Sequence, residues 1–261
     1  MLNDLLIFLL AIASSTASAV VGLGGGLLLI PFIVLIYGMH LKLVAGTMLF
    51  AMVPFTLVAT LRNVKEGYVN FKIGLIMEIG SIIGVIIGSN FSTIIPNLYL
   101  KITLLVIVLY LIFTMRIPTD SSYNYVARGF QHFNFIPPFI NCKTTPTTLC
   151  SIPALISVGL IAGFFAGLLG IGGGFLKTPV LIVGVLLPPK IAVGTSLFMI
   201  LITAATGAVD HAILGHIYYK IGIIITVGMS IGALAGTALL KHISENRIKK
   251  YIVWAMLIAG I

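Results

Sequence analysis

The chain has 261 residues, of which 59% are hydrophobic and 8% are charged, and its mean hydropathy is +1.20. A soluble domain carries about 25% charged residues, so the composition excludes a soluble protein and indicates an integral, multi-pass membrane protein. The formal net charge of +9 does not indicate a nucleic-acid partner, because the cations lie in short segments between apolar runs, where the charge asymmetry of a membrane explains them. The expected surroundings are the lipid bilayer of the plasma (inner) membrane.

Eight apolar runs follow one another along the chain. They cover approximately residues 5–37, 44–61, 71–89, 98–115, 153–187, 192–209, 219–240 and 247–261. Most are near the roughly 17 to 25 residues that a tilted helix needs to cross the hydrocarbon layer. Their hydrophobicity is continuous rather than alternating, which indicates helices. We therefore predict an all-α polytopic membrane protein.

The chain repeats itself at an offset of 148 residues, so that segment 22–101 aligns without a gap with segment 170–249. Ten of the eleven glycines in the first segment match a glycine in the second. The matched pairs are Gly22 and Gly170, Gly24 and Gly172, Gly25 and Gly173, Gly26 and Gly174, Gly46 and Gly194, Gly67 and Gly215, Gly74 and Gly222, Gly80 and Gly228, Gly84 and Gly232, and Gly88 and Gly236. Since only 28 of the 261 residues are glycine, chance would match few of them. The sequence predicts a first transmembrane repeat at 1–115, a connecting loop at 116–152 and a second transmembrane repeat at 153–261.

The runs 5–37 and 153–187 are too long for one crossing and too short for two, and each holds a glycine cluster in its middle. This pattern predicts a pair of half-helices, re-entrant or kinked, in each repeat. If both runs enter the membrane and return, three Lys and Arg residues lie on one side and eleven on the other; if both cross once, the split is seven and seven. Membrane proteins keep more of these cations on the cytoplasmic side, which favours the re-entrant arrangement. Each repeat then adds three crossings, so we expect the second repeat to be inverted.

The two glycine clusters are the strongest local signal for a binding site. Residues 22–26 read Gly-Leu-Gly-Gly-Gly, residues 170–174 read Gly-Ile-Gly-Gly-Gly, and a proline stands five residues beyond each cluster. Such a break frees backbone groups, which membrane depth tolerates only where they face protein or a wet cavity. The helix after each cluster would direct its N-terminal N–H groups and positive dipole end into that cavity, which favours an anion. The alternative is that the glycines only permit close packing.

A lysine and several hydroxyls extend this predicted site. Lys177 lies inside an apolar run, where an ammonium is costly without a partner or an aqueous pathway. One alternative is that Lys177 contacts the anion. The other is that its side chain snorkels to the membrane surface or pairs with another residue in a structural role. Hydroxyls just after Gly46 and Gly194 could donate to an oxyanion or bond their own helix. The predicted substrate-binding residues are Gly22, Gly24, Gly25, Gly26, Thr47, Gly170, Gly172, Gly173, Gly174, Lys177, Thr195 and Ser196.

Three titratable residues are candidates for proton or ion coupling, or for pairing with Lys177. Glu78 lies in the middle of one run, and Asp210 and His211 close another. His216 follows His211 after five residues and so lies off its helical face, which argues against a metal pair.

Other kinds of chemistry find little support. The sequence lacks HExxH, GxSxG and a cysteine-based catalytic pair, so we expect no enzyme and no catalytic residue. Cys142 and Cys150 are interpreted as incidental thiols, too few for a disulfide framework or a metal site. We expect no metal ion and no cofactor. Glycines at every fourth position in 80–88 and 228–236 are interpreted as packing faces, either within the chain or in a homodimer.

Four motifs stand together with the duplicated layout: GLGGGLLLIP from Gly22, GIGGGFLKTP from Gly170, Gly46-Thr47, and Gly194-Thr195-Ser196. This combination resembles the TauE/SafE sulfite exporter family of membrane permeases over nearly the whole chain. The resemblance implies import or export of small sulfur-containing anions such as sulfite, thiosulfate, sulfoacetate or other organosulfonates, driven by an ion gradient. Leu29 stands in the first repeat where the second has Lys177, so the site roles are carried more firmly onto the second repeat.

The interpretation that follows is a secondary transporter that moves small sulfur-containing oxyanions by alternating access around the glycine breaks. The alternative is an ion-coupled permease for a cation or a neutral metabolite, in which Glu78 and Asp210 line the cavity and Lys177 faces outward. A non-transporting partner subunit is a third option, which the matched glycine breaks disfavour.

Overall fold

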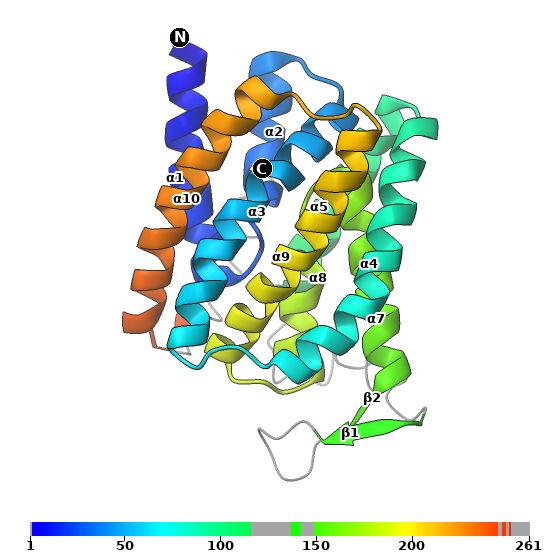
Figure 1. Ribbon diagram of the computed structural model, residues 1–261, viewed down its shortest axis with the longest axis vertical. Coiled ribbons are helices and arrows are strands. Elements are labelled where there is room, and N and C mark those ends of the chain that lie inside the picture. The colour runs from blue at the N-terminus through cyan, green and yellow to red at the C-terminus, as the bar shows by residue number, and fades with distance from the viewer. Residues whose placement is uncertain (1, 116–136, 142–148, 245–246, 249–250, 252–261) are drawn as a thin grey trace.

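The computed structural model describes residues 2–115, 137–141, 149–244, 247–248 and 251. In this part of the chain the protein is a bundle of helices (Figure 1). The helices are α1 (Leu2–Val21), α2 (Gly26–Tyr37), α3 (Leu41–Lys65), α4 (Phe71–Ile94), α5 (Asn97–Met115), α7 (Ile152–Leu169), α8 (Gly174–Pro179) with its π-helical continuation η1 (Val180–Gly184), α9 (Pro189–Ile213) and α10 (Tyr219–His242). Six of those described, α1, α3, α4, α7, α9 and α10, are long and apolar enough to cross a membrane. The predicted all-α membrane protein is confirmed, while the crossing predicted at 247–261 lies almost entirely outside the described residues.

Each glycine cluster ends one helix and begins another. In the cluster at 22–26, three glycines have φ between 78° and 89°, a left-handed backbone region that glycine adopts without a Cβ penalty. The Tyr37 hydroxyl at the end of α2 donates a 2.7 Å hydrogen bond to Asp4 Oδ1 at the start of α1, so this run enters the bundle and returns to the same end. However, α1 has 20 residues and α7 has 18. The prediction of half-helices is therefore wrong for the first helix of each pair, and only α2 and α8 with η1 are short.

Glycines let two pairs of helices pack closely, α1 against α10 and α4 against α7 (Figure 1). A Cβ at each of these glycines would meet a backbone carbonyl oxygen of the partner helix. The facing positions are, in order, Gly228 and Phe8, Gly232 and Ile12, and Gly236 and Thr16 for the first pair, and Gly80 and Ile156, Gly84 and Leu160, and Gly88 and Phe164 for the second. Because the residue numbers rise together, the two helices of each pair run parallel. The glycine faces therefore pack within the chain.

Replacing Gly84 by alanine is expected to destabilise the protein by about 1 to 3 kcal/mol, the usual cost of overpacking. The added methyl group would lie 2.7 Å from the Phe164 amide nitrogen on α7, and helix backbone cannot swing aside as a flexible side chain can. Thermal unfolding in detergent micelles measures the loss. Ile83→Ala is the matched control, because Ile83 lies next in the chain but is 50% exposed on the outer surface. Equal unfolding temperatures for Gly84→Ala and the unaltered protein would contradict the close contact of α4 with α7.

Apart from Lys177, the Lys and Arg residues of the described helices divide between the two ends of the bundle. Lys190 Nζ donates a 3.0 Å hydrogen bond to the Lys241 carbonyl oxygen, and Lys241 Nζ lies 2.9 Å from Glu66 Oε1. The end of α3, the start of α9 and the end of α10 therefore lie together, and we call this the basic end. It also holds Arg62, Lys65 and Lys72, whereas Lys42, Lys101 and Lys220 lie at the starts of α3, α5 and α10 at the opposite end. The positive-inside rule predicts that the basic end faces the cytoplasm.

A short hairpin lies outside the helices at one end of the bundle (Figure 1). Its strands β1 (Phe139–Asn141) and β2 (Leu149–Ser151) pair antiparallel, with Ile140 opposite Cys150. Cys150 forms a disulfide, so its interpretation as an incidental thiol is wrong. Residues 116–136 and 142–148 of the connecting loop lie outside the described residues.

Candidate functional site

The two glycine clusters meet inside the bundle. A Cβ on Gly26 would lie 2.6 Å from the carbonyl oxygen of Gly170, and a Cβ on Gly174 would lie 3.0 Å from the carbonyl carbon of Leu23. All residues of both clusters are buried. The helices that follow, α2 and α8, begin without a side-chain cap, although the first N–H groups of a helix have no partner within the helix. The structure thus brings together the eight glycines predicted from the sequence, in a closed arrangement.

Two hydroxyls of the second repeat bind the backbone of the first glycine cluster. Thr178 Oγ1 donates a 2.8 Å hydrogen bond to the Gly22 carbonyl oxygen, and Ser196 Oγ donates another of 2.9 Å to the same atom. The carbonyl that the helix break releases is therefore satisfied at depth, as a membrane interior requires. Ser196 is a predicted oxyanion donor, but here its hydroxyl donates to backbone, so that role stays a prediction. Thr178 is a contact that was not predicted from the sequence. Its signal was its position next to Lys177 in the first turns after the break.

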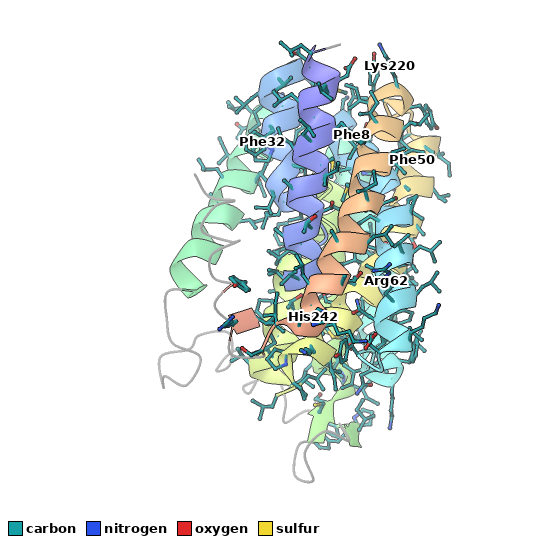
Figure 2. The ribbon with its side chains drawn as sticks, turned by 90° about the vertical axis from the view of Figure 1, so that its left-hand side faces the viewer. Phe8, Phe32, Phe50, Arg62, Lys220 and His242 are labelled. Carbon is teal, nitrogen blue, oxygen red and sulfur yellow. The ribbon has the colours of Figure 1, made fainter. Side chains whose placement is uncertain are left out.

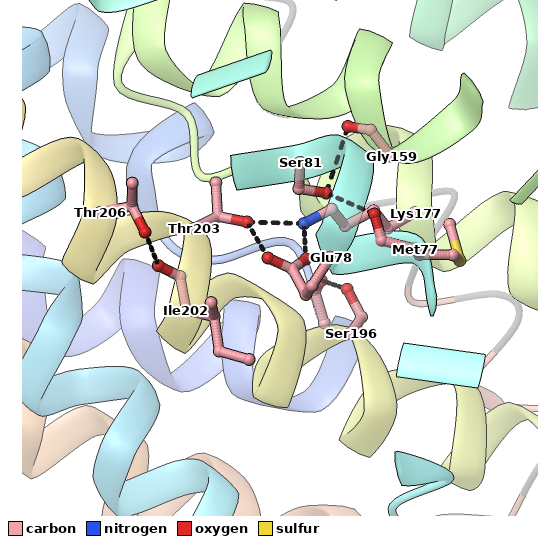
Figure 3. A network of polar contacts seen from close by, with 10 residues as sticks. Met77, Glu78, Ser81, Gly159, Lys177, Ser196, Ile202, Thr203 and Thr206 are labelled. Carbon is pink, nitrogen blue, oxygen red and sulfur yellow. Dashed lines mark hydrogen bonds and ion pairs between the residues drawn. The ribbon is translucent and has the colours of Figure 1, made fainter. Parts of the chain in front are cut away.

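Lys177 lies at the centre of a buried polar network (Figure 3). Its side chain is fully buried, and its Nζ pairs with Glu78 Oε1 of α4, whose side chain is 2% exposed. The Thr203 hydroxyl on α9 joins the two charges, because it accepts a 2.7 Å hydrogen bond from Lys177 Nζ and donates one of 2.8 Å to Glu78 Oε2. Helices α4, α8 and α9 thus each contribute one member. Thr203 was missed by the sequence analysis, although it lies two helical turns after Ser196 and so on the same face of α9.

The network places one cation and one anion where neither is solvated. Removing a charge from water costs several kcal/mol per ion, so a buried ion is kept only with a partner and further hydrogen bonds. Lys177 and Glu78 meet this condition through each other and Thr203. Of the alternatives for Lys177, outward snorkelling is wrong, and the structure shows the pairing with Glu78. Contact with an anion stays a prediction.

Asp210 and His211 lie outside the hydrogen-bond network of Lys177. Asp210 Oδ2 accepts hydrogen bonds from Ser89 Oγ and, at 3.1 Å, from Asn90 Nδ2, both on α4. His211 Nε2 lies 2.8 Å from the Gly167 carbonyl oxygen. Neither residue therefore shares a hydrogen bond with Lys177, and a role in proton or ion coupling stays a prediction for both.

The His211 ring also faces the His216 ring. Their Nδ1 atoms are 3.3 Å apart, although the helical spacing predicts different faces. The reason is that α9 ends at Ile213, so His216 lies on the loop that turns back. Since a carbonyl only accepts, His211 donates from Nε2, and its Nδ1 then accepts from His216 Nδ1. Burial first, and then the charge of Lys42, lower the pKa of His216, which favours this neutral pair.

The hydroxyls of Thr47 and Thr195 bind loop backbone instead of the glycine clusters. Thr47 Oγ1 accepts a 2.9 Å hydrogen bond from the Tyr218 amide, and Thr195 Oγ1 accepts one of 2.9 Å from the Asn70 amide. Each therefore secures the loop before a helix of the other repeat. Their role as oxyanion donors stays a prediction.

Comparison with known proteins bears on the whole chain. The family model described as Sulfite exporter TauE/SafE matches residues 6–261. The chain belongs to the TauE/SafE family. It is similar to "Probable membrane transporter protein YunE" of Bacillus subtilis, with 28% identity over 99% of this chain and 96% of the relative, and to "Probable membrane transporter protein YdhB" of the same organism, with 23% identity over 100% and 98%. It also resembles "Probable membrane transporter protein MJ0441" of Methanocaldococcus jannaschii, with 34% identity over 43% of this chain and 44% of the relative. No solved structure matches the chain.

The family identifies the general class of this TauE/SafE protein. It is a multi-pass integral membrane protein of a transporter family and not an enzyme. The resemblance noted in the sequence is thereby confirmed.

Proposed function

We propose that the protein is a secondary transporter that moves small sulfur-containing oxyanions, such as sulfite, thiosulfate or organosulfonates, by alternating access. The observation that carries the proposal is the fully buried ammonium of Lys177, one turn beyond the meeting point of two glycine breaks. A buried cation beside two uncapped helix N-termini offers charge and N–H donors to an oxyanion. The description of the family as sulfite exporters supports the sulfur-containing class.

An inverted tandem repeat would supply the two-fold frame for alternating access. The helix bounds support it, since Leu41–Lys65 and Phe71–Ile94 reappear 148 residues later as Pro189–Ile213 and Tyr219–His242. The directions of the helices also support the inverted repeat, because α1 runs downward in Figure 1 while its counterpart α7 runs upward. We infer repeats at 1–115 and 153–261 that interlock, with the first helix of each packed on the other. A homodimer stays a prediction.

Glu78 would serve as the resident anion that the substrate replaces. In the closed arrangement its carboxylate neutralises Lys177. A proton on Glu78 would remove that charge and leave the ammonium free for an incoming anion. The centre is neutral in both states, as a carboxylate and an ammonium before, and as a carboxylic acid, an ammonium and a monovalent anion after. For a monovalent anion such as hydrogen sulfite, this exchange couples one proton to one anion moving in the same direction. Divalent thiosulfate would need a second proton to keep the centre neutral.

The alternative of a cation or neutral-metabolite permease requires Glu78 to line a site while Lys177 faces outward. The buried pair between these two side chains speaks against it.

Uptake into proteoliposomes that contain the purified protein tests the proposed function. We expect flux of a sulfur oxyanion, in a panel of sulfite, thiosulfate, sulfoacetate, sulfate and chloride, that exceeds chloride flux and rises with an inward proton gradient. The measurement is initial uptake with and without the gradient. Folded protein that carries none of these anions, or that carries cations instead, would overturn the proposal.

A further inference from the structure

A second polar pocket lies away from the Lys177 network, at the basic end between α3 and α10. Its volume is about 320 Å³, and it is lined on one side by Arg62, Asn63, Lys65 and Glu66 and on the other by Lys241 and His242. Figure 2 shows Arg62 and His242 toward the same end of the bundle. The transport mechanism proposed above uses none of these residues.

Cations outnumber anions in this pocket. Glu66 pairs with Lys241 at 2.9 Å, across the gap between the two helices. Arg62 Nη1 donates a 2.9 Å hydrogen bond to the Leu234 carbonyl oxygen of α10, which neutralises no charge. Arg62 and Lys65 therefore keep a positive charge that the lining residues leave uncompensated. Basic residues also complement the negative dipole end of a helix, so the cations alone would not indicate a ligand.

Asn63 gives evidence for a ligand that does not depend on the cations. Its side chain is only 2% exposed, and its Nδ2 has no hydrogen-bond partner among the described residues. One turn earlier on α3, Thr60 Oγ1 is also buried and has no hydrogen-bond partner in the part of the chain that the structure describes. A buried donor without an acceptor is costly, so such groups in native structures call for an explanation. Asn63 belongs to the lining of the basic pocket, so a rotation of its side-chain amide would let Nδ2 donate to an anion bound there.

Apolar side chains flank the pocket toward the bilayer. On α3 these are Leu57, Leu61 and Val64, which share one helix face and are 40% to 55% exposed; on α10 they are Val227, Ile231 and Leu234, 43% to 50% exposed. A polar, cationic pocket at the membrane surface with apolar flanks below it matches the two parts of a phospholipid. A free phosphate would gain nothing from the apolar flanks.

We propose that this pocket binds the phosphate group of an anionic phospholipid, with Asn63 Nδ2, Arg62 and Lys65 as donors and the acyl chains along the exposed faces of α3 and α10. The lipid would then join the ends of two helices that belong to different repeats. The site is independent of the transported substrate.

Thermal unfolding of the full chain in detergent tests the site, with phosphatidylglycerol, phosphatidylcholine or inorganic phosphate added. We expect stabilisation by phosphatidylglycerol and little by the other two. Lys65→Gln should bind phosphatidylglycerol about tenfold more weakly, as expected for the loss of one charge-assisted contact. Lys72→Gln, at the same end but outside the pocket, should match the unaltered protein.

Asn63→Leu separates a ligand donor from a structural residue. Without lipid, the variant should unfold at the same or a higher temperature, because it removes an unsatisfied donor. With phosphatidylglycerol, it should lose most of the stabilisation. Full stabilisation of Asn63→Leu by the lipid would overturn the site, and so would equal loss in Lys72→Gln. Stabilisation by inorganic phosphate equal to that by phosphatidylglycerol would overturn the lipid as the source of the phosphate.

Discussion

Substitution of Lys177 by leucine is expected to lower sulfur oxyanion uptake by proteoliposomes at least about tenfold, since loss of a charge-assisted hydrogen bond costs about 1.5 to 3 kcal/mol. The Lys177 ammonium is fully buried beside the glycine breaks, so water cannot replace it as the counter-charge of the anion. The measurement is initial uptake as a function of anion concentration.

The same substitution leaves Glu78 buried without its cation. Breaking a buried pair in this way costs about 3 to 5 kcal/mol of stability. Transport would then fall because less protein is folded, and not because the anion binds more weakly. The double variant Lys177→Leu with Glu78→Gln removes both charges and should recover most of that stability. Its uptake should stay low, because the binding cation is still missing. Thermal unfolding and uptake measured on the same preparations separate binding from folding.

Lys101→Leu is the matched control, because Lys101 is exposed at the start of α5. It removes one positive charge from the protein without touching the network. An unchanged concentration dependence of uptake in the stable double variant would remove Lys177 from the binding site.

The helix breaks at the glycine clusters and the need of Lys177 for a partner could be predicted from the sequence. A cluster such as 170–174 breaks an apolar helix whatever surrounds it, and a lysine at 177 must find a partner at membrane depth. The lengths of the helices on either side of each break could not be predicted. An apolar run of about 33 residues has the same composition whether it divides into two equal halves or, as in the structure, into α1 with 20 residues and α2 with 12.

The hydrogen-bond partners of hydroxyl groups were harder to predict than those of charged side chains. A threonine in an apolar helix usually bonds its own preceding turn, as Thr56 does to the Met52 carbonyl oxygen. Thr203 instead bridges two charges, and nothing in its local sequence distinguishes the two cases. His216 was misplaced for a different reason. The helical wheel was extended past Ile213, where α9 ends.

Exchange of Glu78 for glutamine is expected to abolish the stimulation of uptake by a proton gradient while anion exchange continues. Glutamine has nearly the shape of protonated glutamic acid, and its carbonyl oxygen can still accept from Lys177 Nζ or Thr203 Oγ1. It carries no charge at any pH, so it cannot compete with the anion for the ammonium. In the unaltered protein, a proton that enters with the anion would neutralise the carboxylate and free Lys177. Uptake should therefore rise with an inward proton gradient, and this rise should vanish in the variant.

Two readouts distinguish this coupling role from a structural one. Uptake against a concentration gradient, driven by an inward proton gradient, should fall to the background level in Glu78→Gln. Exchange of internal for external labelled anion should persist, because the ammonium and the glycine breaks remain. Glu66→Gln at the basic end, where Glu66 is 37% exposed, should retain both activities. Proton-driven accumulation by Glu78→Gln would show that the coupling proton binds elsewhere, with Asp210 and His211 as the next residues to replace, since both lie on α9, two turns beyond Thr203.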